Sequence, residues 1–164
     1  MTRRVAKLGF VAKRRLAVLA AVTIAATVAC SDPLGPQSQL DELQEAQDLW
    51  RSRRPLRYAY TIQRQCFCTE DARGPVRVTV DGETVVSQLY EDGRMVDAAA
   101  TDWFPSVDGL FAVLLDAIDE GAYEIRVTYD AQFGVPVDFW IDYSQNIIDE
   151  ELGFMVTAAV QPIS

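Results

Sequence analysis

The chain contains no histidine among its 164 residues, and it has few lysines and cysteines. Without histidine, the usual Ser-His-Asp and Cys-His nucleophile systems are excluded, as are metal sites built on imidazole ligands. Lys7 and Lys13 both stand near the N-terminus, so no lysine further along can form a Schiff base. The sequence also lacks a phosphate-binding loop and a G-x-G-x-x-G motif. We therefore expect no enzymatic activity and no bound cofactor.

The first thirty residues have the pattern of an export signal. The first fifteen positions hold basic residues and no acid, and residues 16–29 form an uncharged apolar run of fourteen residues. This run is shorter than the ~20 residues that a membrane-spanning helix needs, so a cleaved signal peptide is predicted over residues 1–29. The boundary "TVAC" resembles the lipobox of bacterial lipoproteins, in which the cysteine, here Cys30, receives a diacylglycerol. Ordinary cleavage before an unmodified cysteine is the alternative.

The lipobox resemblance predicts an exported protein that its lipid holds on the bacterial cell envelope. Thr27 departs from the aliphatic residue that is usual at its position, whereas Val28 and Ala29 fit the pattern. By the same resemblance, Ser31 in place of aspartate permits sorting to the outer membrane of a Gram-negative cell. Residues 30–39 are predicted to be the lipidated cysteine and a flexible tether, and residues 40–164 a single domain.

Removal of the signal peptide makes the chain strongly acidic. All 24 acidic residues follow Cys30, against nine basic residues, so the mature net charge is −15. Such a charge repels phosphate backbones, and we expect no binding of nucleic acid. The expected partners are the membrane, through the lipid on Cys30, and an unknown envelope protein or small ligand.

The hydrophobic pattern predicts an α+β fold. Apolar residues recur at helical spacing over residues 40–50, and Pro55 is the position beyond which this predicted helix cannot continue. A second helix is predicted from Ser106 to Gly121. Period-two alternation predicts six strands, at residues 56–63, 76–81, 83–89, 123–130, 135–143 and 154–160. Asp81-Gly82 is a typical hairpin turn. Because the connections are short, we expect a single antiparallel sheet of about six strands with two helices packed on one face.

Four segments together resemble a known family. They are "CFC", "GPVRVTVDGETV", "SVDGLFAVLLDAI" and "VTYDAQFGVPVDFWIDYSQNIIDEELGF", and the likeness runs from Trp50 to about Val160. The family is domain of unknown function 6174, which occurs in bacterial secreted proteins and lipoproteins. It carries no established activity, so the resemblance implies domain limits and no mechanism. It also implies that three sets of residues are family features: Cys66 with Cys68, Gly134 with Pro136, and Asp149 with Glu150.

Acidic residues cluster near one predicted strand. Asp138 and Asp142 share a strand face with Trp140, and Asp149 stands in the following acidic turn. Acids beside an exposed tryptophan can bind a cation or a sugar, or work as an acid–base pair. We state as a hypothesis that Asp138, Asp142 and Asp149 form a weak cation site. The preferred interpretation is a solvated strand face and an acidic turn, because a chain this acidic clusters its acids by chance.

A small basic patch stands out in this acidic chain; it consists of Arg51, Arg53, Arg54 and Arg57. Charge pairing within the domain and contact with anionic lipid headgroups are the two interpretations. Four arginines are few for a lipid-binding patch, so we prefer pairing within the domain.

Cys66 and Cys68 lie one residue apart after a predicted strand. In a regular strand, such residues are ~6.6 Å apart on the same face, whereas a disulfide needs Cβ atoms ~3.8 Å apart. The pair can bond only where the chain leaves strand geometry. An oxidising compartment favours a local disulfide as the leading interpretation. Two buried thiols, and a Cu(I) or redox pair, are the alternatives.

These observations favour a lipid-anchored envelope protein with a non-enzymatic binding or structural domain. The alternative function is a copper-binding or redox protein that uses Cys66 and Cys68.

Overall fold

The computed structural model describes residues 35–147 and 150–164 of the chain. The predicted signal peptide, the predicted lipidation site Cys30 and the acidic residue Asp149 lie outside these described residues. Within the described part of the chain, no helix is both long and apolar enough to cross a membrane.

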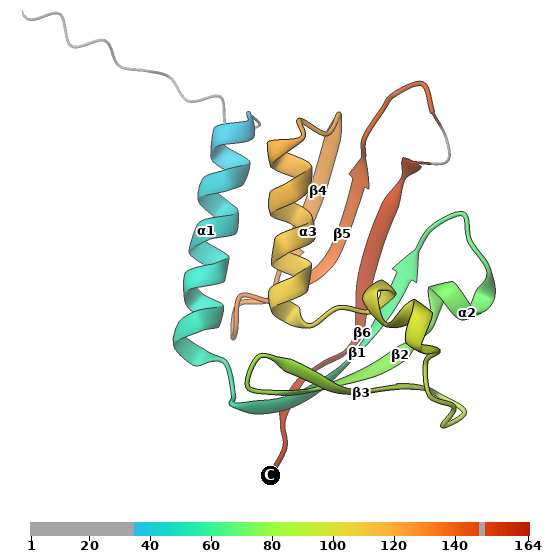
Figure 1. Cartoon of the computed structure of the whole chain (residues 1–164). Coiled ribbons are helices and arrows are strands. Elements are labelled where there is room, and N and C mark those ends of the chain that lie inside the picture. The colour runs from blue at the N-terminus through green and yellow to red at the C-terminus, as the bar shows by residue number, and fades with distance from the viewer. Residues whose placement is uncertain (1–34, 148–149) are drawn as a thin grey trace, which may run out of the picture. The chain divides into compact units, whose positions relative to one another are not determined.

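One open sheet of six antiparallel strands forms the larger layer of the domain, and it confirms the predicted fold class (Figure 1). The strand order is β3-β2-β1-β6-β5-β4, so the final strand lies inside the sheet, between β1 and β5. The strands are β1 Arg57–Gln65, β2 Val76–Asp81, β3 Thr84–Tyr90, β4 Glu124–Tyr129, β5 Pro136–Asp142 and β6 Leu152–Pro162.

Two helices, α1 (Pro36–Arg53) and α3 (Val107–Asp119), pack on the same face of the sheet (Figure 1). The predicted N-cap of α3 is confirmed, because the Ser106 hydroxyl accepts a hydrogen bond from the Gly109 amide at 3.2 Å. Helix α1 begins four residues before residue 40, so part of the predicted tether is helical. Pro36 suits the first helical turn, where its missing N–H would have no partner within the helix.

Two short helical segments did not follow from periodicity: α2 (Glu70–Arg73) and the 3₁₀ helix η1 (Ala98–Trp103). Gln88 of β3 holds η1 in place from the buried side. Its amide nitrogen donates to the carbonyl oxygens of Thr101 and Phe104, at 2.8 and 2.6 Å. A buried amide with both N–H groups paired avoids the cost of an unsatisfied polar group.

Asp108, at the start of α3, joins the two long helices. Its carboxylate accepts from the Trp50 indole and from the Arg54 guanidinium, each at 3.1 Å. The other arginines of the basic patch also find partners within the domain, and two of these partners are acids, as the preferred interpretation predicts. These contacts are Arg51 with Asp48, Arg53 with the carbonyl of Gln132, and Arg57 with Asp81.

The loop between β4 and β5 docks on α1. The Asp130 carboxylate organises it by accepting from the amides of Gln132, Phe133 and Val135 at 2.8 to 2.9 Å. Gly134, with φ +77°, stands so close to α1 that a Cβ there would overlap the carbonyl of Ala46. The glycine of the G-x-P segment therefore serves both a left-handed turn and a close helix approach.

Alternation along the strands separates a buried face from an open face, but the pattern has exceptions. Leu56 and Tyr123 were predicted as the first residues of two strands, but they precede β1 and β4 and are 75% and 57% exposed. Ala158 of β6 is exposed because the β1–β6 register shifts beside Thr61. Such a shift changes the face to which later side chains point. The β2–β3 turn consists of Gly82 and Glu83, one residue later than predicted.

Candidate functional site

The sheet face opposite the helices carries two rows of side chains from four neighbouring strands. Cross-strand register, which places residues of adjacent strands opposite each other, defines both rows. The first row comprises Gln65 of β1, Gly153 of β6, Trp140 of β5 and Arg126 of β4. The second row comprises Gln63, Met155, Asp138 and Thr128 of the same strands.

Gly153 allows its two neighbours in the first row to pack closely over it. A Cβ on this residue would stand 2.7 Å from Cε3 of Trp140 and 3.1 Å from Oε1 of Gln65. The side chains of both neighbours therefore occupy the space that a side chain at position 153 would fill. A glycine inside a strand often marks such a close approach.

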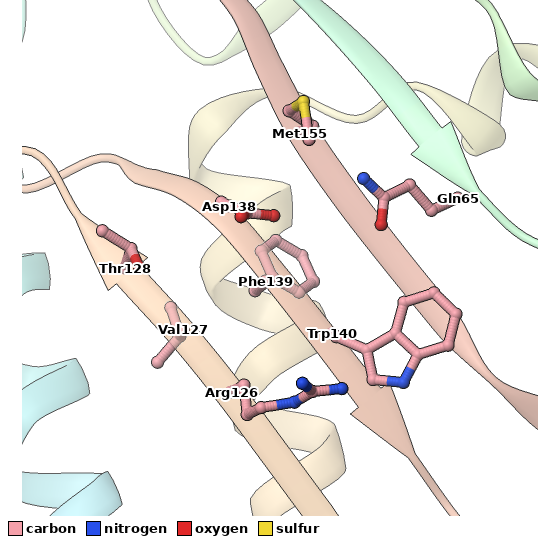
Figure 2. A pocket seen from close by; sticks show the side chains of 8 residues that line it. All are labelled: Gln65, Arg126, Val127, Thr128, Asp138, Phe139, Trp140 and Met155. Atoms are coloured by element: carbon pink, nitrogen blue, oxygen red, sulfur yellow. The ribbon is translucent and has the colours of Figure 1, made fainter.

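A hollow of about 340 Å³ lies over these two rows. Figure 2 shows Arg126 extending from β4 toward Trp140, with Gln65 on the β1 side and Asp138 and Met155 at the other end. The hollow thus combines an aromatic ring, an amide, a guanidinium and a carboxylate. Val127 and Phe139 also line it, although both pack against the core beneath. This composition offers stacking and hydrogen bonding to a polar molecule.

Charge in the hollow is balanced within a strongly acidic protein. Arg126 brings a cation and Asp138 an anion, and Arg126 also pairs with Glu124 at 3.4 Å on the exposed surface. The remaining polar members, Gln65 and Thr128, are neutral donors and acceptors. No single charge sign dominates the hollow, so it favours neither a free anion nor a free cation.

Cys66 and Cys68 form a disulfide directly beyond the end of β1. This geometry supports the leading interpretation of the pair: the strand ends at Gln65, and the two Cα atoms are 5.3 Å apart. This value is within the usual range for disulfides, whereas regular strand spacing would hold the sulfurs apart. A bonded pair supplies no thiolate for Cu(I), so the copper hypothesis requires a reduced form.

The disulfide turns Phe67 outward, and this side chain is 92% exposed. A second hollow, of about 380 Å³, lies between Phe67 and the first one. Trp140 and Gln65 belong to both hollows, and Arg73 and Glu151 line the second. The two hollows are therefore adjoining parts of one groove, with Trp140 in its middle and Phe67 toward one end.

Arg64 lies at the rim of this groove and reaches toward η1. Its guanidinium carbon is 6.0 Å from the ring centre of Trp103, and its buried Nε has no hydrogen-bond partner among the described residues. Burial lowers the pKa of Arg64. An arginine nevertheless stays charged in proteins.

The predicted cation site is only partly described. Asp138 lies in the first hollow, and Asp142 lies four residues along β5, about 13 Å away by strand geometry. The Asp142 carboxylate accepts from the Ser144 amide at 2.9 Å. Asp149 lies outside the described residues, and among residues 35–147 and 150–164 no group of three or more acids and cysteines is placed to hold a metal. The cation site stays a prediction.

The sequence pointed to Trp140 and Asp138 but missed Gly153, Gln65 and Arg126. Strand parity put Arg126 on the open face, yet the row that joins it to Trp140 depends on cross-strand register. Gly153 carried a usable signal, because a glycine within a strand pattern indicates a bulge or a close approach.

One protein family, whose function is unknown, matches the sequence of this chain. A family model described as "Family of unknown function (DUF6174)" matches residues 42–161, a range that includes both hollows and the disulfide. This match confirms the resemblance seen in the sequence motifs. Comparisons with curated proteins and with solved structures find no match.

Proposed function

Because the chain belongs to DUF6174, a family of unknown function, we propose its role from its own residues. It acts as a lipid-anchored domain of the bacterial cell envelope that binds a small polar ligand on the open sheet face and catalyses no reaction. The observation that carries this proposal is the hollow of about 340 Å³ that Trp140, Gln65, Arg126 and Asp138 line.

The hollow is suited to binding by its position as well as its composition. A single-layer sheet has one face on the core and one in water, and the water-facing side is ordinarily a plain set of polar side chains. Here a partly buried indole lies beside an amide and two opposite charges. Small-molecule sites are concave surfaces with few orienting polar groups, and the volume of this hollow is at the lower end of their range.

Lipid attachment at Cys30 would keep the domain near the membrane. Helix α1 begins at Pro36, so only residues 31–35 separate it from the proposed anchor. Five residues span at most about 18 Å when fully extended. The domain would therefore sample ligands close to the membrane surface.

The anchor is tested by expressing the full chain and its Cys30→Ser variant in a Gram-negative host. We expect the parent protein in the membrane fraction, with an intact mass that includes a diacylglycerol. The serine variant should lose both properties. A parent protein that is released without added mass would refute the anchor.

Ligand binding is tested on the mature protein in a detergent without a sugar headgroup, by the change in tryptophan emission. The probes are glucose, N-acetylglucosamine, free amino acids, dipeptides, choline and inorganic phosphate. We expect at least one probe to change the emission of the parent and not that of Trp140→Phe. The Trp103→Phe variant is the matched control, because Trp103 is also exposed but lies outside both hollows. An identical response from the Trp140→Phe variant would contradict the proposal, as would a parent that binds neither these probes nor longer sugars and peptides.

A further inference from the structure

We infer that the ligand is a neutral oligosaccharide of at least two pyranose units, bound along the groove formed by the two hollows. This inference rests on the proposed function, which requires only some polar ligand at the first hollow. It names the chemical class and adds the second hollow, with Phe67, as a further subsite.

The first argument is the aromatic surface. Gly153 allows the Trp140 indole to lean over the sheet rather than stand upright from it, since any Cβ at this position would collide with the ring edge. A pyranose ring with equatorial hydroxyls presents a flat face of C–H groups that packs on an indole. Its hydroxyls then point sideways, toward the amide of Gln65, the guanidinium of Arg126 and the carboxylate of Asp138. Planar amide, guanidinium and carboxylate groups offer the paired donors and acceptors that neighbouring hydroxyls need.

The second argument excludes other ligand classes. An extended peptide adds to a sheet through backbone hydrogen bonds at an exposed edge. Of the strands that line the groove only β4 is an edge strand, and Gln65 and Trp140, which both hollows share, lie on the interior strands β1 and β5. Nucleic acid is repelled by a mature charge of −15. A free anion meets Asp138 and Glu151, and a free cation meets Arg126 and Arg73. A neutral ligand with many hydroxyls is the class that this surface suits.

The third argument concerns length. The two hollows share Trp140 and Gln65, so a ligand that crosses Trp140 reaches both. Their volumes, about 340 and 380 Å³, are similar, and the second has its own aromatic side chain. Phe67 is 92% exposed, and the disulfide between its two neighbours holds the loop that carries it. One sugar unit on Trp140 and another beside Phe67 would use both surfaces.

The test measures binding of cellotetraose, chitotetraose, glucose and tetra-alanine to the mature protein, in the same sugar-free detergent. We expect one of the tetrasaccharides to bind at least tenfold more tightly than glucose. Trp140→Leu, which keeps an apolar side chain without an aromatic face, should abolish binding. Phe67→Ala should weaken the tetrasaccharide at least fivefold and leave glucose unchanged. Since Phe67 is almost fully exposed, this variant retains the fold, which circular dichroism checks for both variants.

The other possible results distinguish failure of the oligosaccharide inference from failure of the proposed function. Equal affinity for glucose and the tetrasaccharides, with no effect of Phe67→Ala, would refute the second subsite and thus the oligosaccharide. Binding of tetra-alanine alone, lost in Trp140→Leu, would refute the sugar and leave the proposed function intact. Absence of binding by every probe in both this series and the earlier panel would refute the proposed function as well.

Discussion

Replacement of Gly153 by alanine tests the geometry of the hollow with a single methyl group. The new Cβ would stand 2.7 Å from Cε3 of Trp140, 2.9 Å from the carbonyl oxygen of Phe139 and 3.1 Å from Oε1 of Gln65. The indole and the amide can move aside, but the carbonyl belongs to the backbone of an interior strand. The methyl group therefore displaces Trp140 and strains β5.

Two effects of opposite sign decide the magnitude. Alanine in place of glycine in a strand stabilises by roughly 0.5–1 kcal/mol, because the unfolded chain loses conformational freedom. Overpacking at a filled position costs about 1–3 kcal/mol. Since one of the close contacts is to backbone, we expect the second effect to win, with a net loss of about 1–2 kcal/mol in the free energy of unfolding.

Urea denaturation of the parent and of Gly153→Ala measures this difference, and the emission of Trp140 reports the displaced ring. The same substitution in a Trp140→Ala background is the control. There the ring contact is gone, so the cost should fall while the contact with the Phe139 carbonyl remains. An alanine variant as stable as the parent, with unchanged emission, would refute the close packing that we describe at Gly153.

The remaining predictions concern the parts that support the site. Gln88→Leu should lower the free energy of unfolding by about 1–3 kcal/mol in urea, because the Phe104 carbonyl loses its buried side-chain donor and the Thr101 carbonyl loses one of its two donors. An unchanged free energy of unfolding would count against this link. Asp130→Ala should cost about 1–3 kcal/mol and Asp130→Asn less, because asparagine retains one carbonyl acceptor; equal losses would contradict that order. Burial raises the pKa of Tyr60 well above its usual value near 10, so the folded state binds this proton more tightly than the unfolded state. The free energy of unfolding should therefore be constant up to about pH 10 and fall above it. Urea midpoints at several pH values would show this fall, and the Tyr60→Phe variant should show a smaller one. Reduction of the Cys66–Cys68 disulfide should cost at most about 1.5 kcal/mol, because the closed loop is so short, as paired urea titrations with and without dithiothreitol would show; a larger loss would mean that the bond supports more than its own loop.

The fold was largely predictable because its elements carry strong periodic signals. Helix α3 has a continuous apolar stripe with Ser106 as its cap, and β2 alternates without interruption. The errors occur where tertiary contacts override local pattern. Ala158 follows the alternation of β6, yet the register shift beside Thr61 leaves it in solvent. The 3₁₀ helix η1 is held by hydrogen bonds from Gln88, a residue of strand β3.

The candidate site was less predictable than the fold, for a physical reason. Trp140 and Asp138 share a strand, so parity alone places them together. Gln65 and Arg126 join them only through the pairing of four strands, which no local pattern specifies. The disulfide was an intermediate case. Strand geometry showed that the two cysteines can bond only if β1 ends before Cys66, but the sequence did not show where β1 ends.

The central place of β6 has a consequence for how the chain is made. The β1–β2–β3 meander and the β4–β5 hairpin have no direct strand pairing with each other, and β6 joins them. Residues 152–162 follow every other strand of the sheet in the chain, so the middle of the sheet cannot close before they have been made. If the protein is exported as we propose, this delay keeps the chain unfolded enough to pass through a translocation channel. The groove, whose lining includes residues of β1 and β5 that only β6 brings together, would then assemble on the far side of the membrane.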